Sequence, residues 1–528
     1  MNNKQLTLIL LALFVILMSL PWLVPHMGFT ALFGLFPLLA AERIASETHI
    51  KRFFLYHYGA FVAWNAATTF WVCNATVGGG IAAIMLNALQ MSLVFGLFRI
   101  SRKRLKGFLP YVFLMCAWIA WERFYYGAEI SWPWLVLGGA FARTTSLVQW
   151  YSLTGTLGGS LWIWAVNLAL FAILVSLSDG NWVMKSRRSQ AFTLASGLIL
   201  LLGPIAASET MYFNFGEKSE GRVDVLIGQP NFDPYHKFES MTQSQQNAVL
   251  LSLFEKEDTP DLYIAPETFT SDIVLGDLEN SATWRAFSKF VGEREGATML
   301  LGASTYEIFR QRSCPNILAR PFGDGWILNH NSAMTLSGSG KTEIYHKSRL
   351  VPGVEKTPYP RLFNKIDEAL GGVMGRCVPQ KEAAVLHCCD SVPFGCAICY
   401  ESIYGEYCTE YVKRGARFLT VITNDAWWGD TPGYKQHFSY SRLRAIETRR
   451  DLARCGNTGI SAIINQRGDI VKKGGWWTEE TLRGEINLNS VMTPFVRYGD
   501  VAGKVCILGF LLLLLLLLTT PFRQKRVG

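Results

Sequence analysis

Charged residues are scarce in this chain. Lys, Arg, Asp and Glu together make up 17% of its 528 residues, whereas about 25% is usual in soluble proteins. Hydrophobic residues make up 50%, which excludes a disordered or collagen-like chain. The length and the 11 cysteines exclude a small domain that depends on disulfides for its stability.

Acidic residues are nearly missing outside one segment. Residues 208–502 contain 36 acidic and 32 basic residues, whereas the rest of the chain contains 5 acidic and 18 basic ones. The net charge of +9 therefore comes from the apolar remainder, where basic residues cluster between hydrophobic runs. No basic and aromatic stripe, zinc-finger spacing or helix-turn-helix pattern accompanies them, so nucleic acid is not an expected partner.

Apolar runs near the length that a helix needs to cross a bilayer, about 17–25 residues, recur along the chain. The first resembles a signal peptide but has no small-x-small cleavage site, and more runs follow, so we predict an uncleaved first helix. Fewer spans with some buried soluble helices are the alternative, but the eight consecutive leucines at 511–518 are hard to place in water. The predicted spans are 5–24, 28–42, 53–73, 78–99, 107–122, 158–178, 190–207 and 504–521.

Basic residues lie in alternate loops, which predicts the orientation of the spans because cytoplasmic loops are enriched in Lys and Arg. The basic loops are 43–52, 99–106 and 179–189, together with the C-terminal tail, which carries Arg523, Lys525 and Arg526. We therefore expect eight spans with both termini cytoplasmic. The predicted parts are a membrane domain (1–207), an extracytoplasmic domain (208–502), and a last helix with its basic cytoplasmic tail (503–528).

The loop at 123–157 is long, apolar and aromatic. Such residues suit a membrane interface, so the loop is expected to form re-entrant or interfacial helices or to act as a simple interfacial anchor. Its aromatic residues include Trp132, Trp134, Trp150 and Tyr151.

Short apolar and β-branched runs alternate with polar stretches of helical spacing after residue 220. This alternation predicts one layered α/β domain. The expected strands are 223–227, 262–265, 299–302, 395–399, 418–423 and 460–465, and the expected helices are 240–256, 281–294 and 436–454.

Three segments of this domain carry residues suited to nucleophilic catalysis. Glu267 follows a predicted strand, Lys347 lies in a polar segment with Pro and Gly, and Cys399 ends a strand before a helical pattern. A Cys near a helix N-terminus is favoured as a thiolate. A carboxylate could take its proton, and a Lys could stabilise an oxyanion. Each residue alone is better explained as a cap, a solvated loop residue or a buried thiol.

The order Glu, Lys, Cys, each in its own short motif, resembles the carbon–nitrogen hydrolase (nitrilase) superfamily. Together with eight spans and a domain between the last two, the chain resembles the bacterial apolipoprotein N-acyltransferases over essentially its whole length. Further stretches are similar to that family, namely 423–430, 437–447 and 457–459.

The resemblance implies an α-β-β-α sandwich next to a polytopic helical membrane domain, and a Glu-Lys-Cys triad. Cys399 would be the nucleophile, Glu267 the general base and Lys347 the oxyanion stabiliser. Glu355 would be a second acidic residue in the Lys loop, and Asn331 an active-site Asn that precedes the Lys.

The resemblance also extends to the residues around Cys399. Tyr400 and Glu401 match the family's Cys-Tyr-Glu step, although they could simply orient the turn. Trp427 matches an aromatic residue on a substrate-facing loop, although it could be an ordinary interface aromatic. Asn424 precedes it in the same stretch.

Two features depart from the family. The segment after Lys347 reads Val-Pro-Gly-Val-Glu-Lys-Thr-Pro, where relatives often have Val-Pro-Phe-Gly-Glu, so an aromatic contact to the acyl chain is absent. Residues 208–502 also contain eight cysteines, among which disulfides could form in an oxidising compartment. The CxxC spacing of Cys396 and Cys399 falls on a strand and its end, so we expect no metal or redox site.

The implied activity is transfer of a fatty acyl chain from a membrane phospholipid to the N-terminal amine of an S-diacylglyceryl cysteine on apolipoproteins. The donor would be phosphatidylethanolamine, the intermediate a Cys399 thioester, and the location a bacterial inner membrane. No cofactor is expected, and we expect a monomer. The alternatives are a membrane-anchored amidase that hydrolyses small amides, and a non-enzymatic lipoprotein-binding scaffold.

Overall fold

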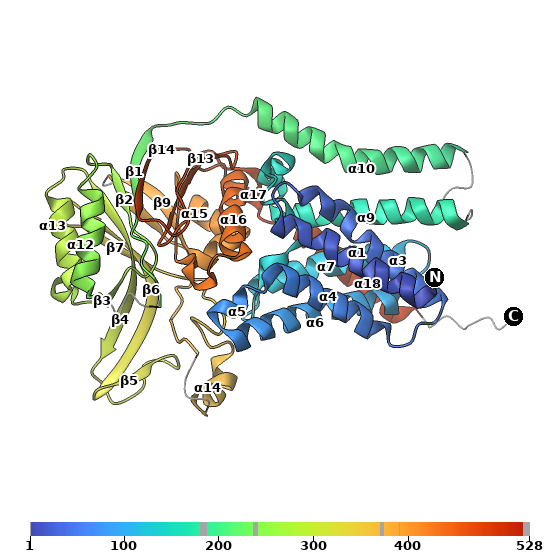
Figure 1. The fold of residues 1–528 in the computed structure, drawn as a ribbon, viewed down its shortest axis with the longest axis horizontal. Helices are drawn as coiled ribbons and strands as arrows, with labels where there is room; N and C mark the ends of the chain where they lie inside the picture. The colour runs from blue at the N-terminus through green and yellow to red at the C-terminus, as the bar shows by residue number, and fades with distance from the viewer. Residues whose placement is uncertain (1, 180–186, 236–240, 370–373, 390, 521–528) are drawn as a thin grey trace. The chain divides into compact units, whose positions relative to one another are not determined.

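The structure is a computed structural model that describes residues 2–179, 187–235, 241–369, 374–389 and 391–520 (Figure 1). The chain forms two compact units. The first, the helical unit, comprises Met1–Phe215 and Tyr498–Gly528, and the second, the sheet unit, comprises Gly216–Arg497. Most of the basic loop at 179–189 and the basic tail after 520 lie outside the described residues.

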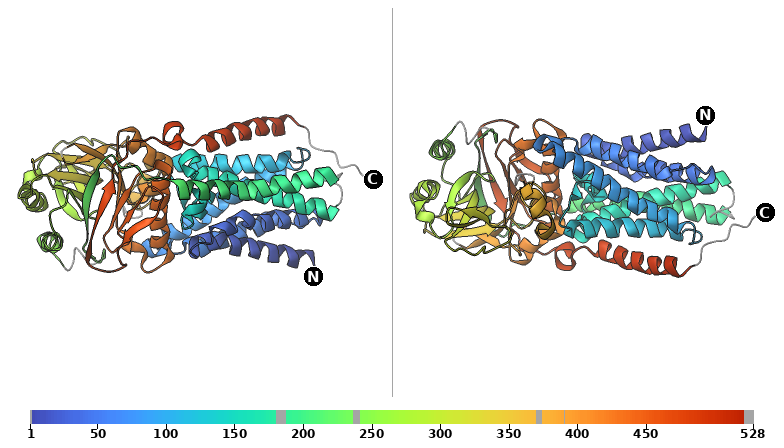
Figure 2. Two further views of the ribbon diagram at one scale, coloured as in Figure 1. Left: turned by 90° about the horizontal axis from the view of Figure 1, so that it is seen from above. Right: turned by 90° about the horizontal axis from the view of Figure 1, so that it is seen from below.

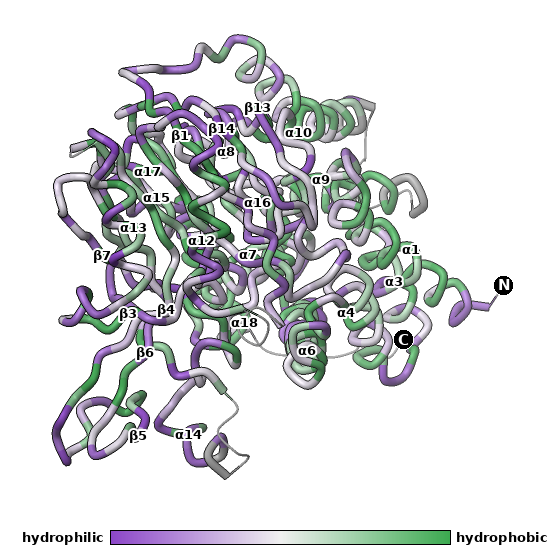
Figure 3. Tube along the Cα trace, turned by 60° about the vertical axis from the view of Figure 1, so that its left-hand side comes forward, coloured by the Kyte–Doolittle hydropathy of each residue, from purple (hydrophilic) through white to green (hydrophobic). Residues whose placement is uncertain are grey.

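The helical unit is built from long apolar helices and short connecting helices. Its long helices run side by side along one direction (Figure 2), and α1 and α10 are largely apolar along their length (Figure 3). The helices are α1 (Asn3–Leu23), α2 (Ala31–Gly34), α3 (Phe36–Glu47), α4 (Phe53–Thr69), α5 (Val72–Ala75), α6 (Val77–Ser101), α7 (Leu109–Gly127), α8 (Tyr151–Thr154), α9 (Thr156–Asp179), α10 (Arg187–Asn214) and α18 (Val501–Thr519).

Six helical stretches among the described residues are long and apolar enough to cross a membrane. They are Asn3–Leu23, Gly28–Glu47, Val77–Ser101, Thr156–Val175, Ala191–Asn214 and Val501–Thr519. The two other predicted spans lie on α4, which has 17 residues, and on α7, which carries Glu122 and Arg123 near its end. The prediction of several membrane helices is confirmed, and the number eight stays a prediction.

The loop at 123–157 folds into the helical unit. It forms three 3-10 helices and the single turn α8. The 3-10 helices are η2 (Pro133–Leu135), η3 (Leu137–Phe141) and η4 (Thr145–Val148). Trp134 and Tyr151 are completely buried within the protein, and the interfacial position of the loop stays a prediction. Glu122 holds the loop, because its carboxylate accepts bonds from the backbone N–H of Leu137 (2.8 Å) and the indole of Trp118 (3.1 Å).

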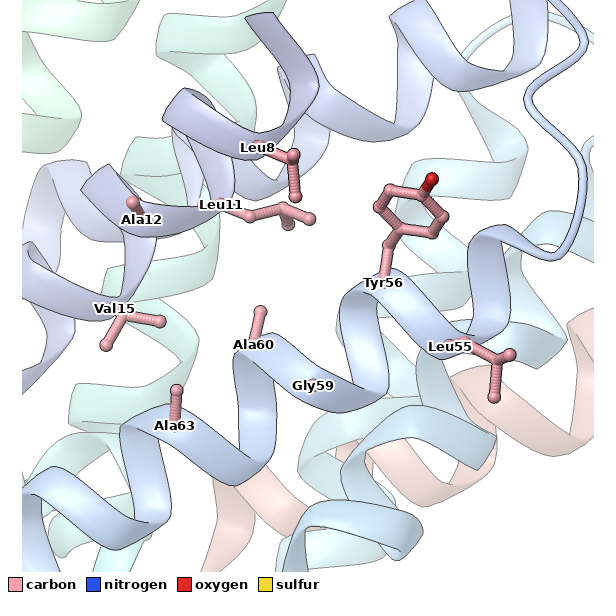
Figure 4. Close-up of a pocket in the computed structure, with 9 residues that line it drawn as sticks. All are labelled: Leu8, Leu11, Ala12, Val15, Leu55, Tyr56, Gly59, Ala60 and Ala63. Atoms are coloured by element: carbon pink, nitrogen blue, oxygen red, sulfur yellow. The ribbon is translucent and has the colours of Figure 1, made fainter. Parts of the chain in front are cut away.

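An apolar groove of about 470 Å³ lies between α1 and α4 (Figure 4). Its lining contains only one residue with a titratable group, Tyr56, beside small residues such as Gly59, Ala60 and Ala63. The groove therefore has no group for catalysis. Hydrocarbon chains can fill such an apolar groove, as expected of a surface in a membrane domain.

Two β-sheets form the centre of the sheet unit. The first has the order β14-β1-β2-β4-β6-β5, with β3 next to β4 and β7 next to β6. Its strands are β1 (Arg222–Gln229), β2 (Leu262–Ile264), β3 (Thr270–Val274), β4 (Thr298–Phe309), β5 (Arg320–Phe322), β6 (Gly325–Ser337), β7 (Thr342–His346) and β14 (Glu480–Asn487).

The second sheet has the order β13-β12-β11-β10-β9-β8. Strands β9, β10 and β11 run parallel, as do β1, β2 and β4 in the first sheet. Its strands are β8 (Val385–Cys388), β9 (Val392–Ile398), β10 (Leu419–Thr423), β11 (Leu452–Gly456), β12 (Ala462–Ile464) and β13 (Ile470–Lys473).

Helices cover the outer face of each sheet (Figure 1). On the first sheet, Leu250 and Phe254 of α12 (Gln243–Phe254) and Phe287 of α13 (Ala282–Gly292) form one apolar core with strand residues such as Tyr263 and Met299. On the second sheet lie α15 (Gly405–Lys413) and α16 (Pro432–Thr448). The predicted α-β-β-α sandwich is confirmed.

The two sheets pack face to face through small and apolar side chains. Cys455 of β11 is completely buried, and its thiol donates to the backbone oxygen of Gly228 in β1 at 3.3 Å. Cys455 is a free thiol in the part of the chain that the structure describes. This contact is therefore made by a reduced cysteine that acts as a small core residue.

Two predicted boundaries need correction. The helix expected at 436–454 ends at Thr448, because Arg449 takes a left-handed conformation with φ 50°. The next residues form the buried strand β11 instead. The strand expected to end at Cys399 ends at Ile398, and Cys399 begins the 3-10 helix η6 (Cys399–Ile403).

Candidate active site

A buried cluster of one Lys and two Glu lies at the ends of strands of the first sheet. Lys347 directly follows β7, and its Nζ donates to Glu267 Oε1 at 3.1 Å and to Glu355 Oε1 at 2.9 Å. Asn331 of β6 donates its amide to the same two oxygens, at 2.8 Å and 2.7 Å. The structure therefore brings four of the predicted site residues into one hydrogen-bonded group.

The backbone holds both carboxylates from their other side. The N–H of Asn424, which follows β10 of the second sheet, donates to Glu267 Oε2 at 3.1 Å. The N–H of Val351 donates to Glu355 Oε2 at 2.7 Å. Each carboxylate is thus fixed at both oxygens, and Glu267 links the two sheets at the ends of their strands.

Electrostatics keep Lys347 charged. Its side chain is 1% exposed, and this burial disfavours the charge, but the carboxylates of Glu267 and then Glu355 outweigh it and hold the pKa of Lys347 well above the usual range. A fixed ammonium inside a low-dielectric site is suited to stabilising an oxyanion.

Cys399 lies at the turn between β9 and η6, partly exposed, with φ 51° in the left-handed region. Burial, and next the charge of Glu267, raise the pKa of its thiol well above the usual value, against the opposing charge of Lys347. The thiol is therefore protonated near neutral pH and needs a base when it reacts. Glu267 is the carboxylate with the strongest electrostatic effect on it.

Glu401 connects the Cys turn to the Lys loop. It is completely buried and accepts bonds from the N–H of Ile398 at 2.8 Å, of Ser348 at 2.6 Å and of Arg349 at 3.1 Å. Ile398 directly precedes Cys399, and Ser348 directly follows Lys347. One carboxylate thus fixes the distance between the two segments.

Tyr400 and Trp427 lie differently. Tyr400 is buried and packs edge-to-face on Tyr404, with ring centroids 5.4 Å apart. Trp427, in the 3-10 helix η7 (Asp425–Trp428), is 40% exposed, and its ring meets that of Tyr235 at 5.1 Å. An exposed aromatic pair suits contact with an apolar substrate, whereas Tyr400 belongs to the core of the turn.

Both units match families of known proteins. Residues 316–493 match the carbon-nitrogen hydrolase family, and residues 15–169 match the family described as the apolipoprotein N-acyltransferase N-terminal domain. The apolipoprotein N-acyltransferase of Chlorobaculum tepidum is 27% identical over 503 residues, which is 92% of this chain and 91% of that protein. The apolipoprotein N-acyltransferase of Geobacter metallireducens is 26% identical over 482 residues, which is 89% of this chain and 86% of that protein.

The chain belongs to the apolipoprotein N-acyltransferase family. As a member of this family with several apolar helices, it is a multi-pass bacterial membrane protein. The resemblance inferred from the sequence is thereby confirmed.

Within this family member, the structure shows polar side chains near Cys399 that the sequence analysis did not single out. The hydroxyls of Tyr345 and Tyr411 donate to Glu401 at 2.7 Å and 3.3 Å. On the other side, Asp425, His437 and Arg454 form a buried network behind Cys399. Asp425 lies two residues beyond the end of β10, whereas His437 and Arg454 lie within α16 and β11, so only the fold brings the three together.

The hydrogen bonds that the Asp425 carboxylate already accepts disfavour a metal ion at this network. The Cys399 thiol, an Asp425 oxygen and a His437 nitrogen lie within 4.8 Å of one another. However, Arg454 donates to one oxygen of Asp425 at 2.6 Å, and Thr423 donates to the other at 2.7 Å. Protein donors already satisfy the carboxylate, so we assign it no metal.

Replacing Glu401 with Gln is expected to destabilise the sheet unit and to lower its catalytic activity. The amide N–H₂ of Gln would face backbone N–H donors, which leaves buried groups unpaired at a cost of about 2–4 kcal/mol. We expect a lower unfolding temperature and a turnover number reduced about 100-fold. Glu410→Gln on α15 is the matched control, because this Glu is a surface residue that pairs with Lys413. Equal behaviour of the two variants would contradict the bridging role of Glu401.

Proposed function

We propose that this chain transfers a fatty acyl chain from a membrane phospholipid to the N-terminal amine of the S-diacylglyceryl cysteine of apolipoproteins, through a thioester on Cys399. The observation that supports this most directly is the group of Glu267, Lys347 and Cys399 in a chain whose two parts both match the family. The donor is phosphatidylethanolamine, cleaved at its sn-1 ester.

In the first half-reaction, Glu267 takes the proton of the Cys399 thiol, and the sulfur attacks the ester carbonyl. The tetrahedral oxyanion is stabilised by the Lys347 ammonium and the backbone N–H of Tyr400. The carbon–oxygen bond then breaks, Glu267 returns the proton to the leaving oxygen, and a lysophospholipid departs. The acyl group remains on sulfur as a thioester.

In the second half-reaction, the amine of the diacylglyceryl cysteine attacks the thioester carbonyl. Glu267 takes the proton from the nitrogen, the carbon–sulfur bond breaks, and the sulfur is protonated again. The product is an amide, and the free thiol is restored. Because one product leaves before the second substrate reacts, the kinetics are ping-pong.

The remaining predicted residues support this chemistry. Asn331 and Glu355 fix the position of Lys347. Glu401 holds the turn at Cys399, and the N–H of Asn424 holds Glu267. Trp427 contacts the acyl chain of a substrate, for which its exposed ring is suited.

The membrane topology that we propose with this function is based on the Lys and Arg residues of the loops. Residues 1–207 and 503–528 are the membrane part, with eight spans and cytoplasmic termini, and residues 208–502 are the extracytoplasmic catalytic part. The enzyme acts as a monomer and needs no cofactor.

An acceptor-competition assay tests the function against the amidase alternative. Detergent-solubilised protein receives phospholipid with a labelled sn-1 chain, and either a diacylglyceryl cysteine peptide or a small amide. We expect the label in the peptide as an amide, and no release of ammonia from the small amide. Rapid hydrolysis of the small amide, without peptide acylation, would favour the amidase. The family match disfavours this result, because an amidase has no need of the membrane helices.

A further inference from the structure

His437 of α16 reaches the backbone of the proposed nucleophile. Its side chain is completely buried, and its Nε2 lies 3.1 Å from the backbone oxygen of Cys399. The hydroxyl of Ser402 donates to the same oxygen at 2.7 Å. The carbonyl of Cys399 is therefore held by two side chains, one of which comes from a distant helix.

The chemistry of the two groups determines which of them donates in a hydrogen bond between His437 and the Cys399 carbonyl. A carbonyl oxygen only accepts hydrogen bonds, so a hydrogen bond between these two atoms requires the hydrogen on Nε2. The Ser402 hydroxyl also lies 3.0 Å from Nε2. The other ring nitrogen, Nδ1, lies 2.8 Å from Asp425 Oδ1 and 3.1 Å from Arg454 Nη2. Asp425 and Arg454 are themselves joined at 2.6 Å, so the ring is held from behind by a buried ion pair.

The peptide plane transmits this constraint to the next residue. In a trans peptide, the C=O of one residue and the N–H of the following residue point in opposite directions. The only cis peptide among the described residues is at Gly459–Ile460, so the Cys399–Tyr400 bond is trans. Fixing the Cys399 carbonyl towards His437 and Ser402 therefore fixes the direction of the Tyr400 N–H.

The backbone at this point also needs an external constraint. Cys399 has φ 51°, a left-handed conformation that is strained for a residue with a Cβ. Such a conformation persists where the surrounding contacts enforce it. The two bonds to its carbonyl are contacts of this kind.

We propose that His437 is a positioning residue for acyl transfer: it holds the Cys399 carbonyl so that the Tyr400 N–H points at the tetrahedral oxyanion, and Asp425 and Arg454 hold its ring. This inference rests on the proposed function. It adds to that function the residue of α16 that sets the direction of the Tyr400 N–H, the oxyanion donor beside Lys347.

The test compares two reactions of the same sulfur. Acylation by phospholipid passes through an oxyanion, whereas alkylation by iodoacetamide is a displacement that forms none. We expect His437→Ala to lower the rate of Cys399 acylation about 10- to 100-fold with unchanged KM, because loss of a full oxyanion donor costs about 100- to 1000-fold. The rate of Cys399 alkylation should stay within about twofold of wild type.

Two further variants sharpen the test. In His437→Gln the amide N–H can replace Nε2–H, so acylation should recover to within about fivefold of wild type. Ser402→Ala combined with His437→Ala removes both donors from one atom, and the two effects should not add independently. His387→Ala is the control, because His387 is a partly exposed residue of β8 that bonds Glu343.

Two results would overturn the inference. One is acylation of His437→Ala at the wild-type rate. The other is a parallel fall of acylation and alkylation, which would show that His437 maintains the thiol or the fold instead of the oxyanion donor. If wild-type protein forms no acyl-enzyme at all, the proposed function fails, which is a different outcome from either of these.

Discussion

Cys399→Ala is expected to lower acyl transfer at least about 10⁴-fold, to the background of the assay. Removing the nucleophile of a catalytic group that acts as a unit has effects of this size. The neighbouring thiol cannot replace it, because Cys396 is completely buried in β9 and burial raises the pKa of its thiol to about 12. No second thiol in this strand is therefore available for attack.

The measurement is transfer of a labelled acyl chain from phospholipid to a diacylglyceryl peptide. Cys314→Ala is the matched control, because Cys314 is an exposed thiol of the same unit, and it should retain wild-type activity. Retention of more than a few per cent of transfer by Cys399→Ala would show that another group carries the acyl chain.

Lys347→Met is expected to abolish transfer and to destabilise the sheet unit. In wild type, the Lys347 ammonium lies between Glu267 and Glu355, with one bond to each. In the variant, the carboxylates of Glu267 and Glu355 still accept bonds from the Asn331 amide, but no cation lies between them. Breaking a buried ion pair from one side costs about 3–5 kcal/mol, so the unfolding temperature should fall together with activity.

A double variant separates the two effects. Lys347→Met combined with Glu355→Gln removes one carboxylate as well, so the buried group regains its wild-type net charge. We expect most of the lost stability to return, measured by thermal unfolding in detergent, while transfer stays at least about 10³-fold below wild type. Recovery of activity along with stability would show that Lys347 has only a structural role.

The fold was largely predictable because its signals are local. Apolar runs and basic loops indicated the membrane helices, and short buried strands alternating with amphipathic helices indicated the sandwich. One boundary error has a long-range cause. β11 looked helical because the residues before it are helical, and only its pairing with β10 makes it a strand. The complete burial of Trp134 inside the folded loop leaves no trace in a local pattern either.

The candidate site was predictable where its residues end strands. Glu267 and Cys399 each follow a short apolar run, and the topology brings such ends together. Lys347 lies in a polar segment of the sequence, and its position directly after β7 appears only in the structure. Asn331 and Glu355 rested on the family resemblance, and their shared bonds to Lys347 and Glu267 appear only in three dimensions. His437 begins the stretch 437–447 that is similar to the family, but its contact with a backbone oxygen 38 residues away appears only in three dimensions.

Intact-protein mass spectrometry can detect the acyl-enzyme on Cys399. Purified protein is incubated with phospholipid of defined acyl chains but without an acceptor, and the adduct is mapped by proteolysis. We expect one acyl group, attached to Cys399, labile to neutral hydroxylamine as a thioester and lost on addition of a diacylglyceryl peptide. Acyl transfer that proceeds without an adduct on Cys399, or with the adduct on another residue, would contradict this expectation.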